Sequence, residues 1–127
     1  MGGRRAVRAG RDRRGQRGAV TAETVMVLPL LVAVTLALCW LVGLGVQQAR
    51  TVDAARETAR LLARDVGDAE AVAAGRAVAP DGARIEVGAD GDRVRVRVVA
   101  PVAGPDVLGW VVGGELSATA VAGREEQ

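Results

Sequence analysis

The hydrophobic positions of the chain begin with one long, unbroken run. No charged residue occurs from Thr24 to Ala49, a run of 26 residues, and its centre from Val25 to Val46 is almost purely aliphatic. As a helix, this centre would rise about 33 Å, enough to cross a hydrocarbon core of roughly 30 Å. The alternative is the buried helix of a soluble protein, but so small a chain could not surround a helix that is apolar on all sides. The run therefore predicts one transmembrane helix.

Helical periodicity continues beyond this run, from Gln47 to Val66. Apolar residues recur there at spacings of three and four, which predicts a narrow apolar stripe. The stripe consists of Val52, Ala55, Ala59, Leu62 and Val66. Another face carries three arginines without aromatic residues between them, and this indicates a solvated face rather than a nucleic-acid site. These are Arg56, Arg60 and Arg64. Gly67 is expected to end the helix, and Asp68 to cap a second one that runs to about Ala79.

A two-residue alternation follows and predicts strands. Val94, Val96 and Val98 alternate with arginines, which is typical of a strand with one face buried and one in water. Strands are expected at 84–87, 93–99 and 116–121, with a turn at 80–82 and a hairpin loop at 88–92. Residues 101–114 are expected to form a loop whose apolar members cover the sheet or meet a partner. The pattern after the long run thus predicts a small α+β unit.

Charge divides the chain into two unlike parts. Residues 1–18 carry seven arginines and one acid, a net charge of +6, whereas residues 19–127 carry ten arginines and fourteen acids, a net charge of −4. The first part is rich in glycine and lacks apolar periodicity, so it is expected to be disordered in isolation. By the positive-inside rule, arginine before the apolar run and mixed charges after it place the N-terminus in the cytoplasm and the C-terminal part outside. We therefore expect a single-pass protein of the cell membrane.

The residue types that carry catalysis are scarce. The chain has no histidine, its only serine is Ser117 and its only cysteine is Cys39. A nucleophile with its base, a disulfide and a histidine- or cysteine-ligated metal site therefore all lack their parts. Asp90 and Asp92 fall short of the roughly six to eight oxygen ligands of calcium and are expected to belong to a turn. We expect no catalytic residues, no enzyme activity, no cofactor, no metal and no nucleic-acid partner.

The junction between the basic segment and the apolar run carries the most specific motif. It reads Arg17-Gly18-Ala19-Val20-Thr21-Ala22-Glu23. A basic leader that ends in Gly, a Glu five residues later and a long aliphatic helix together resemble a type IV prepilin. More specifically, residues 17–24 and 27–31 are similar to the opening of the TadE-like minor pilins, or pseudopilins, of tight-adherence (Tad, Flp-type) pilus systems. Residues 52–56, 83–87, 92–98 and 116–120 are similar to their downstream helix and strands.

This resemblance implies a pilin-like α+β fold, in which a long N-terminal transmembrane helix continues into a small exported helix plus a three-stranded antiparallel sheet. It implies cleavage by a prepilin peptidase between Gly18 and Ala19, and pairing of Glu23 with the free N-terminal amine of a neighbouring subunit. The expected segments are a cleaved cytoplasmic leader (1–18), a transmembrane and assembly helix (19–49), an exported α+β domain (50–122) and a flexible tail (123–127).

The function that the resemblance implies is that of a minor pilin or pseudopilin, acting in pilus assembly or as a fibre or tip component. Such a subunit resides in the membrane and, after assembly, in an extracellular pilus. Its partners would be the prepilin peptidase, other pilin or pseudopilin subunits, the Tad assembly machinery and the membrane.

Three alternatives remain at this stage. The chain could be an uncleaved single-pass membrane protein whose outer domain scaffolds the export machine or binds an envelope partner. Glu23 also has a second interpretation, because an acid in the first turn of a helix interacts favourably with the helix dipole by about 0.3–1 kcal/mol. A conventional signal peptide is the weaker interpretation, since the apolar run exceeds the usual length of roughly 7–15 residues.

Overall fold

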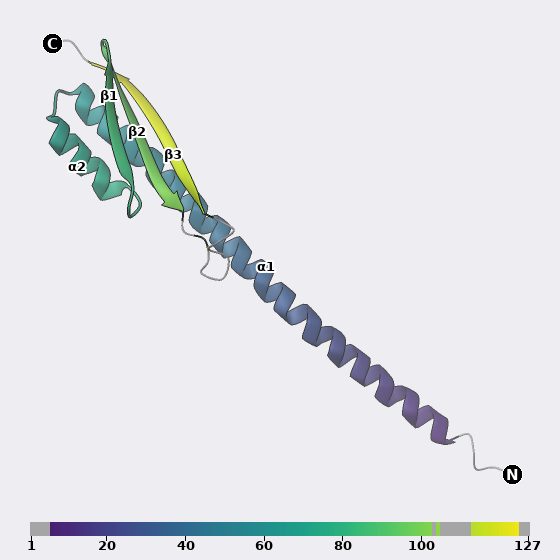
Figure 1. Cartoon of the computed structure of the whole chain (residues 1–127). Coiled ribbons are helices and arrows are strands. Elements are labelled where there is room, and N and C mark those ends of the chain that lie inside the picture. The colour runs from purple at the N-terminus through teal and green to yellow at the C-terminus, as the bar shows by residue number, and fades with distance from the viewer. Residues whose placement is uncertain (1–5, 103, 105–112, 125–127) are drawn as a thin grey trace. The chain divides into compact units, whose positions relative to one another are not determined.

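The computed structural model describes residues 6–102, 104 and 113–124, with side chains described from residue 15 onwards. In this part of the chain, two helices precede three strands, and the strands form one antiparallel sheet (Figure 1). This arrangement confirms the α+β class with a long apolar helix at the N-terminal end. The chain divides into two compact units, Met1–Cys39 and Trp40–Gln127.

Helix α1 spans Ala6–Ala63 and contains Pro29. It begins far earlier than the apolar run, so residues 6–18 are helical in the whole chain, whereas the sequence predicts that this segment is disordered in isolation. The reason lies in helix cooperativity: once the apolar run is helical, extending it needs no new nucleus, and Ala, Arg and Gln favour helix. The glycines at 10, 15 and 18 weaken this extension by about 1 kcal/mol each relative to Ala but do not break it.

The C-terminal end of α1 is closed by an aspartate rather than by a glycine. Asp65 adopts a left-handed conformation (φ 58°), and the N–H of Val66 donates to the carbonyl of Leu61 at 3.2 Å. This is a Schellman arrangement, in which a residue with positive φ satisfies the last carbonyls of the helix. The helix therefore ends at Ala63, and the prediction that Gly67 ends it after Val66 is wrong, because Asp tolerates the left-handed region.

Helix α2 spans Asp68–Val78, and its N-cap is Gly67 without a side-chain hydrogen bond. The expectation that Asp68 caps α2 is therefore wrong by one residue; Asp68 instead lies in the first turn, where the helix dipole favours an anion. The turn predicted at 80–82 is present, since the N–H of Ala83 donates to the carbonyl of Pro80 at 3.2 Å. Gly82 takes a φ of 75° there, which glycine adopts without steric cost.

The three strands are β1 (Arg84–Asp90), β2 (Arg93–Val102) and β3 (Gly114–Gly123). Their order in the sheet is β1-β2-β3, with both pairs antiparallel. Asp90 pairs with Arg93, so the hairpin loop contains only Gly91 and Asp92, rather than the five residues expected. Gly91 has a φ of 60°, and a glycine with positive φ at the first loop position is typical of a type II′ turn.

The boundaries of the last loop and of the tail also differ from the sequence prediction. Pro101 and Val102 belong to β2 and Gly114 to β3, so the loop predicted at 101–114 is shorter. Its apolar members Val107, Leu108, Trp110, Val111 and Val112 lie outside the described residues. The tail was expected from Gly123, but Gly123 is in β3 and the N–H of Arg124 donates to the carbonyl of Asp92 at 2.9 Å. Residues 125–127 lie outside the described residues.

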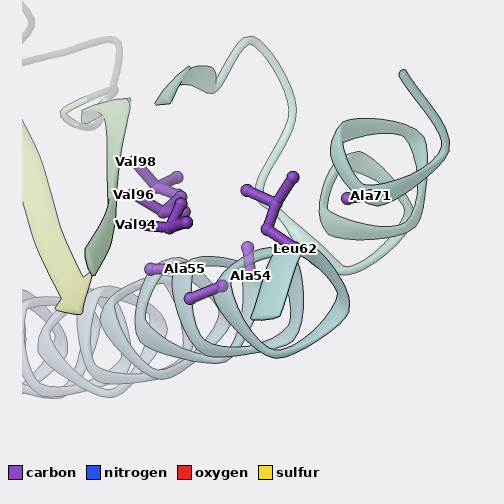
Figure 2. Packing of buried hydrophobic residues seen from close by; sticks show 8 residues of the cluster. Ala54, Ala55, Leu62, Ala71, Val94, Val96 and Val98 are labelled. Atoms are coloured by element: carbon purple, nitrogen blue, oxygen red, sulfur yellow. The ribbon is translucent and has the colours of Figure 1, made fainter. Parts of the chain in front are cut away.

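The core lies between the sheet and the two helices. Val94, Val96 and Val98 point from β2 toward Ala54, Ala55 and Leu62 of α1, with Ala71 contributed by α2 (Figure 2). The alternation predicted for β2 is therefore confirmed, with the three valines buried and Arg93, Arg95 and Arg97 exposed. Of the predicted apolar stripe on α1, Ala55, Ala59 and Leu62 are buried, whereas Val52 and Val66 are half-buried.

Candidate processing and assembly site

The apolar part of α1 presents its side chains outward. The helix segment Gly15–Ala63 is long and apolar enough to cross a membrane, with a mean hydropathy of 2.7 in its most apolar window and none of that window buried. Large aliphatic side chains are exposed along it, for example Met26 at 82% and Leu36 at 65%. A helix that is apolar on all sides and uncovered needs lipid or other apolar helices around it. The chain is therefore membrane-anchored.

The two residues predicted to flank the cleavage site lie in helical conformation. Gly18 and Ala19 are exposed members of α1, and the hydroxyl of Thr21 donates to the carbonyl of Arg17 at 2.8 Å, directly before them. A peptide bond inside a helix is not extended and its polar groups are hydrogen-bonded, so a peptidase gains access only after local unwinding. Glycine lowers the cost of that unwinding by about 1 kcal/mol relative to Ala.

Gly18 leaves open space on the helix surface. A Cβ atom added at Gly18 would meet nothing within 4 Å. An open groove of about 730 Å³ runs past it, bounded by Arg17, Gly18, Thr21, Ala22, Val25 and Met26. The absence of side-chain bulk at Gly18 and Ala22 makes this groove, so another chain can approach the helix backbone here. Packing within the described part of the chain therefore does not require glycine at position 18.

Glu23 is exposed and lies one helical turn after Ala19. Residues four apart share a helix face, so the Glu23 side chain and the residue that would become the new N-terminus lie on the same side of α1. The ion pairs found among residues 15–102, 104 and 113–124 do not include Glu23. Its carboxylate thus faces outward on an apolar helix, next to the predicted cleavage site.

The helix-dipole interpretation of Glu23 is wrong for the intact chain. Helix α1 has no acidic residue in its first turn, because it begins at Ala6 and Glu23 lies deep inside it. The favourable dipole interaction is confined to the first turn. That interaction becomes available to Glu23 only if the chain starts at Ala19.

The remaining chemistry-bearing side chains do not gather into a site. Cys39 is exposed on α1. Within the described part of the chain, no group of three or more His, Cys, Asp or Glu side chains could hold a metal ion. Asp92 lies in the two-residue turn as predicted, whereas Asp90 is the last residue of β1 and pairs with Arg93. On α1, Glu57 and Arg60 form an ion pair at 2.9 Å, which raises the pKa of Arg60 through a hydrogen bond and through charge attraction.

Sequence reasoning missed a second surface, at the edge of the sheet. A groove of about 420 Å³ separates α1 from the free edge of β3. It is lined by Gln48, Val52, Ala55 and Arg56 of α1 and by Ser117–Val121 of β3. The signal that could have pointed to it is the uncharged, small-residue composition of β3 from Leu116 to Ala122.

Comparison with known proteins gives one match. Residues 18–60 match the family model described as TadE-like protein. The match begins at Gly18 and covers the junction motif from that residue, the apolar run and the part of α1 up to Arg60. The resemblance to TadE-like proteins is therefore confirmed over this segment. No curated protein and no solved structure matches the chain.

Proposed function

We propose that this TadE-like, pilus-related membrane protein is a minor pilin or pseudopilin of a Tad-type pilus, matured by a prepilin peptidase that cuts between Gly18 and Ala19. The observation that carries the proposal is the coincidence of two boundaries at Gly18. The charge of the chain changes sign there, and the TadE-like segment begins there. The basic segment is thus separable from the part of the chain that resembles the family.

Cleavage would change the electrostatics of the whole chain. Hydrolysis adds water across the Gly18–Ala19 peptide bond, leaving a carboxylate on Gly18 and an amine on Ala19. The departing leader takes a charge of +6 with it, and the remaining part carries −4 before its new amine is counted. Arginines on the cytoplasmic side hold a helix in its orientation in the bilayer. Their removal would free the helix to leave the membrane during assembly.

Glu23 would act after cleavage, as a positioning group between subunits. A carboxylate within an apolar environment costs several kcal/mol unless it is paired or near water. The amine of Ala19 on a neighbouring subunit would supply the opposite charge. The surrounding helix surface is aliphatic, so the pair between Glu23 and the Ala19 amine would be its charged contact. This pair would therefore fix the axial shift between adjacent helices.

The subunit would then work in the cell membrane, with its N-terminus in the cytoplasm, and in the extracellular pilus after assembly. Its partners would be the prepilin peptidase, other pilin or pseudopilin subunits and the Tad assembly machinery. The exposed aliphatic side chains of α1 support this assignment, because they suit both lipid and packed helices.

Two matched glycine variants test the cleavage site. Gly18→Ala and Gly15→Ala both add one methyl group to α1, and at neither position does the new Cβ meet an atom within 4 Å. On co-expression with a prepilin peptidase, we expect Gly18→Ala to reduce processing by at least about 100-fold, equivalent to about 2.7 kcal/mol. Gly15→Ala should be processed like the unmodified chain.

Both variants raise helix propensity by a similar amount, so a general effect of helix stiffness on cleavage would slow both. Normal processing of Gly18→Ala would contradict the proposed site. If the unmodified chain and both variants all keep residues 1–18, the result would instead support the alternative, an uncleaved single-pass membrane protein with an outer binding or scaffolding domain.

A further inference from the structure

In the described part of the chain, the sheet has two open edges, and the two edge strands run in the same direction. β2 lies between β1 and β3 and is antiparallel to both, so β1 and β3 are parallel to each other. β1 is exposed at six of its seven residues. Each outer strand therefore has a row of backbone N–H and C=O groups that no strand of the described chain pairs.

The edge of β3 lacks the features that usually prevent pairing with another chain. Natural edge strands carry charges, prolines or bulges, or are very short. β3 has ten residues, and it contains no charge and no proline from Leu116 to Ala122. Its pairing with β2 is continuous from Gly114 to Gly123, so no bulge interrupts it. This edge is suited to receive a further strand.

The recess beside β3 could receive an apolar side chain that is exposed on β1. Val52 and Ala55 line the recess between α1 and β3, on the side of the sheet that faces the core. Val87 of β1 pairs with the buried Val96, so it points to the same side, yet it is 38% exposed. A β1 strand placed alongside β3 would direct Val87 toward the side of this recess that Val52 and Ala55 line.

The direction of α1 decides which strand can occupy the edge. Asp65, just past the end of α1, forms an ion pair at 3.7 Å with Arg124, just past the end of β3. The recess lies nearer the N-terminal end of this part of α1 and of β3, since it is lined by Gln48, Val52, Ala55 and Arg56 of α1 and by Ser117–Val121 of β3. β3 therefore runs alongside α1 in the same direction, as Figure 1 also shows. Any copy anchored in the same membrane must keep this direction.

A symmetric pairing of two β3 strands is excluded on this ground. An antiparallel pair related by a two-fold axis would reverse the Trp40–Ala63 part of α1 in one copy. The two ends that lead into the membrane run would then lie at opposite ends of the pair and could not both meet one membrane surface. A two-fold axis parallel to the strands would keep the direction of β3 in both copies. Equivalent residues of the two β3 strands would then lie side by side, but their side chains would point to opposite faces of the sheet. This arrangement breaks the alternation of side chains that neighbouring strands share.

We propose that the β3 edge of one copy pairs in parallel with the β1 edge of a second copy of this chain. The Trp40 ends of α1, which lead into the membrane run, then lie at the same end of the sheet in every copy, and the sheet continues from one copy to the next. Such a head-to-tail contact leaves a β1 edge free on one copy and a β3 edge free on the other, so further copies can add to form a row of subunits. Confinement of the copies to one membrane raises their effective concentration, so a short strand pair is sufficient. The proposal rests on membrane anchoring and not on cleavage.

Cysteine cross-linking of the uncut, full-length chain in phosphatidylcholine–phosphatidylglycerol vesicles tests the contact. The starting variant is Cys39→Ala, which removes the only cysteine. Thr119→Cys reports on β3, and Glu86→Cys, Gly88→Cys or Asp90→Cys reports on β1. Thr119 and Glu86 are both exposed and both pair with Arg97, so they lie at one level of the sheet. Neighbouring strands lie about 4.8 Å apart, within reach of a disulfide.

We expect disulfide-linked dimers when the Thr119→Cys chain is mixed with one of the three β1 variants, and a ladder of multimers when both cysteines are on one chain. Asp53→Cys, at an exposed position of α1 away from both edges, is the matched control for random collision. The β3–β1 mixture should give at least about tenfold more dimer than the same mixture with Asp53→Cys in place of Thr119→Cys.

Three results would overturn the proposal. Dimers from Thr119→Cys alone would show a symmetric β3 pair. Equal cross-linking by the Asp53→Cys control would show collision, and no cross-link in any β3–β1 mixture would show that the edges do not meet. Because the uncut chain is used, none of these results depends on whether a peptidase cleaves at Gly18.

Discussion

Glu23 is a residue whose surroundings would change if the chain is cut after Gly18. In the intact chain it lies well inside α1, which begins at Ala6. After the cut it becomes the fifth residue, so the positive end of the helix dipole and the new amine both come within its first turn. The same carboxylate is thus unsupported in the precursor and supported in the product.

Replacing Glu23 with Gln tests this role at the scale of one side chain. Gln keeps the shape but removes the charge that would pair with the amine of Ala19. We expect Glu23→Gln to be processed normally and to be recovered from the pilus fraction at least about tenfold less, as loss of about 1.4 kcal/mol in the contact would cause. The amount of the subunit in sheared pili, relative to the membrane fraction, is the measurement.

Glu57→Gln is the control, because Glu57 lies outside the apolar run and pairs only with the exposed Arg60 in the described part of the chain. It should reach the pilus fraction like the unmodified chain. Equal recovery of Glu23→Gln and Glu57→Gln would refute an assembly role for the Glu23 charge.

At the scale of elements, the contact between α1 and α2 depends on residues that no periodicity identified. Thr51 and Thr58 are fully buried on α1, and their hydroxyls donate to the carbonyls of Gln47 and Ala54 at 2.8 Å. Gly75 of α2 is buried against the same face. A Cβ atom at Gly75 would collide with the Thr58 hydroxyl and would lie 3.3 Å from the carbonyl oxygen of Ala54. The two helices can therefore approach closely, because Gly75 has no side chain and the hydroxyls of Thr51 and Thr58 are hydrogen-bonded within α1.

Gly75→Ala should loosen this contact. The added methyl group has no room, and overpacking of this kind costs about 1–3 kcal/mol despite the better helix propensity of Ala. We expect faster amide hydrogen exchange in α2 and β2 of the full-length chain in detergent micelles. In the control Gly123→Ala, at the end of β3, the new Cβ meets nothing within 4 Å, so exchange should not change. An unchanged exchange rate in Gly75→Ala would show that α2 moves away at no cost.

The elements differ in how far the sequence predicts them. The alternation around Val96 predicts β2 well, because a one-residue shift would bury arginines instead of valines. The apolar run predicts a helix, but not its start, since the extension through Gly10 and Gly15 depends on helix cooperativity rather than on a local pattern. The sequence does not predict the end of α1 at Ala63, because the left-handed residue that follows the helix is Asp65, at a position that usually favours glycine.

The candidate site was predictable only in part. The motif around Gly18 and Glu23 is local, so sequence spacing sufficed to locate it. The edge of β3 and its recess depend on the order of the strands and on the position of α1, which no local pattern contains. The close approach at Gly75 is likewise a tertiary feature, because it brings together residues 54, 58 and 75.

At the scale of the whole molecule, the division of charge predicts the orientation in the membrane. The seven arginines before residue 19 favour the cytoplasmic side. In a Cys39→Ala chain expressed in cells without a prepilin peptidase, so that residues 1–18 remain attached, Ser117→Cys should react with a membrane-impermeant maleimide added to intact spheroplasts. Gln16→Cys should react only after lysis. We expect the ratio of labelling before and after lysis to differ by at least about tenfold between the two positions. The opposite pattern would invert the proposed topology.

The division of charge also determines how the proposed cleavage would change the chain. The precursor has a net charge of +2, whereas the proposed product carries −4 and a new amine on an aliphatic helix. A chain of this composition has few groups for chemistry and many for packing. Its proposed function as a pilus subunit depends on removal of the segment that accounts for its positive charge.

The most direct test is the intact mass and N-terminal sequence of the chain isolated from cells that contain a prepilin peptidase. We predict a product of 109 residues (127 minus 18) that begins at Ala19, and the full 127-residue chain when the peptidase is inactivated. Recovery of the 127-residue chain from both kinds of cell, or a product that begins anywhere other than Ala19, would contradict the account.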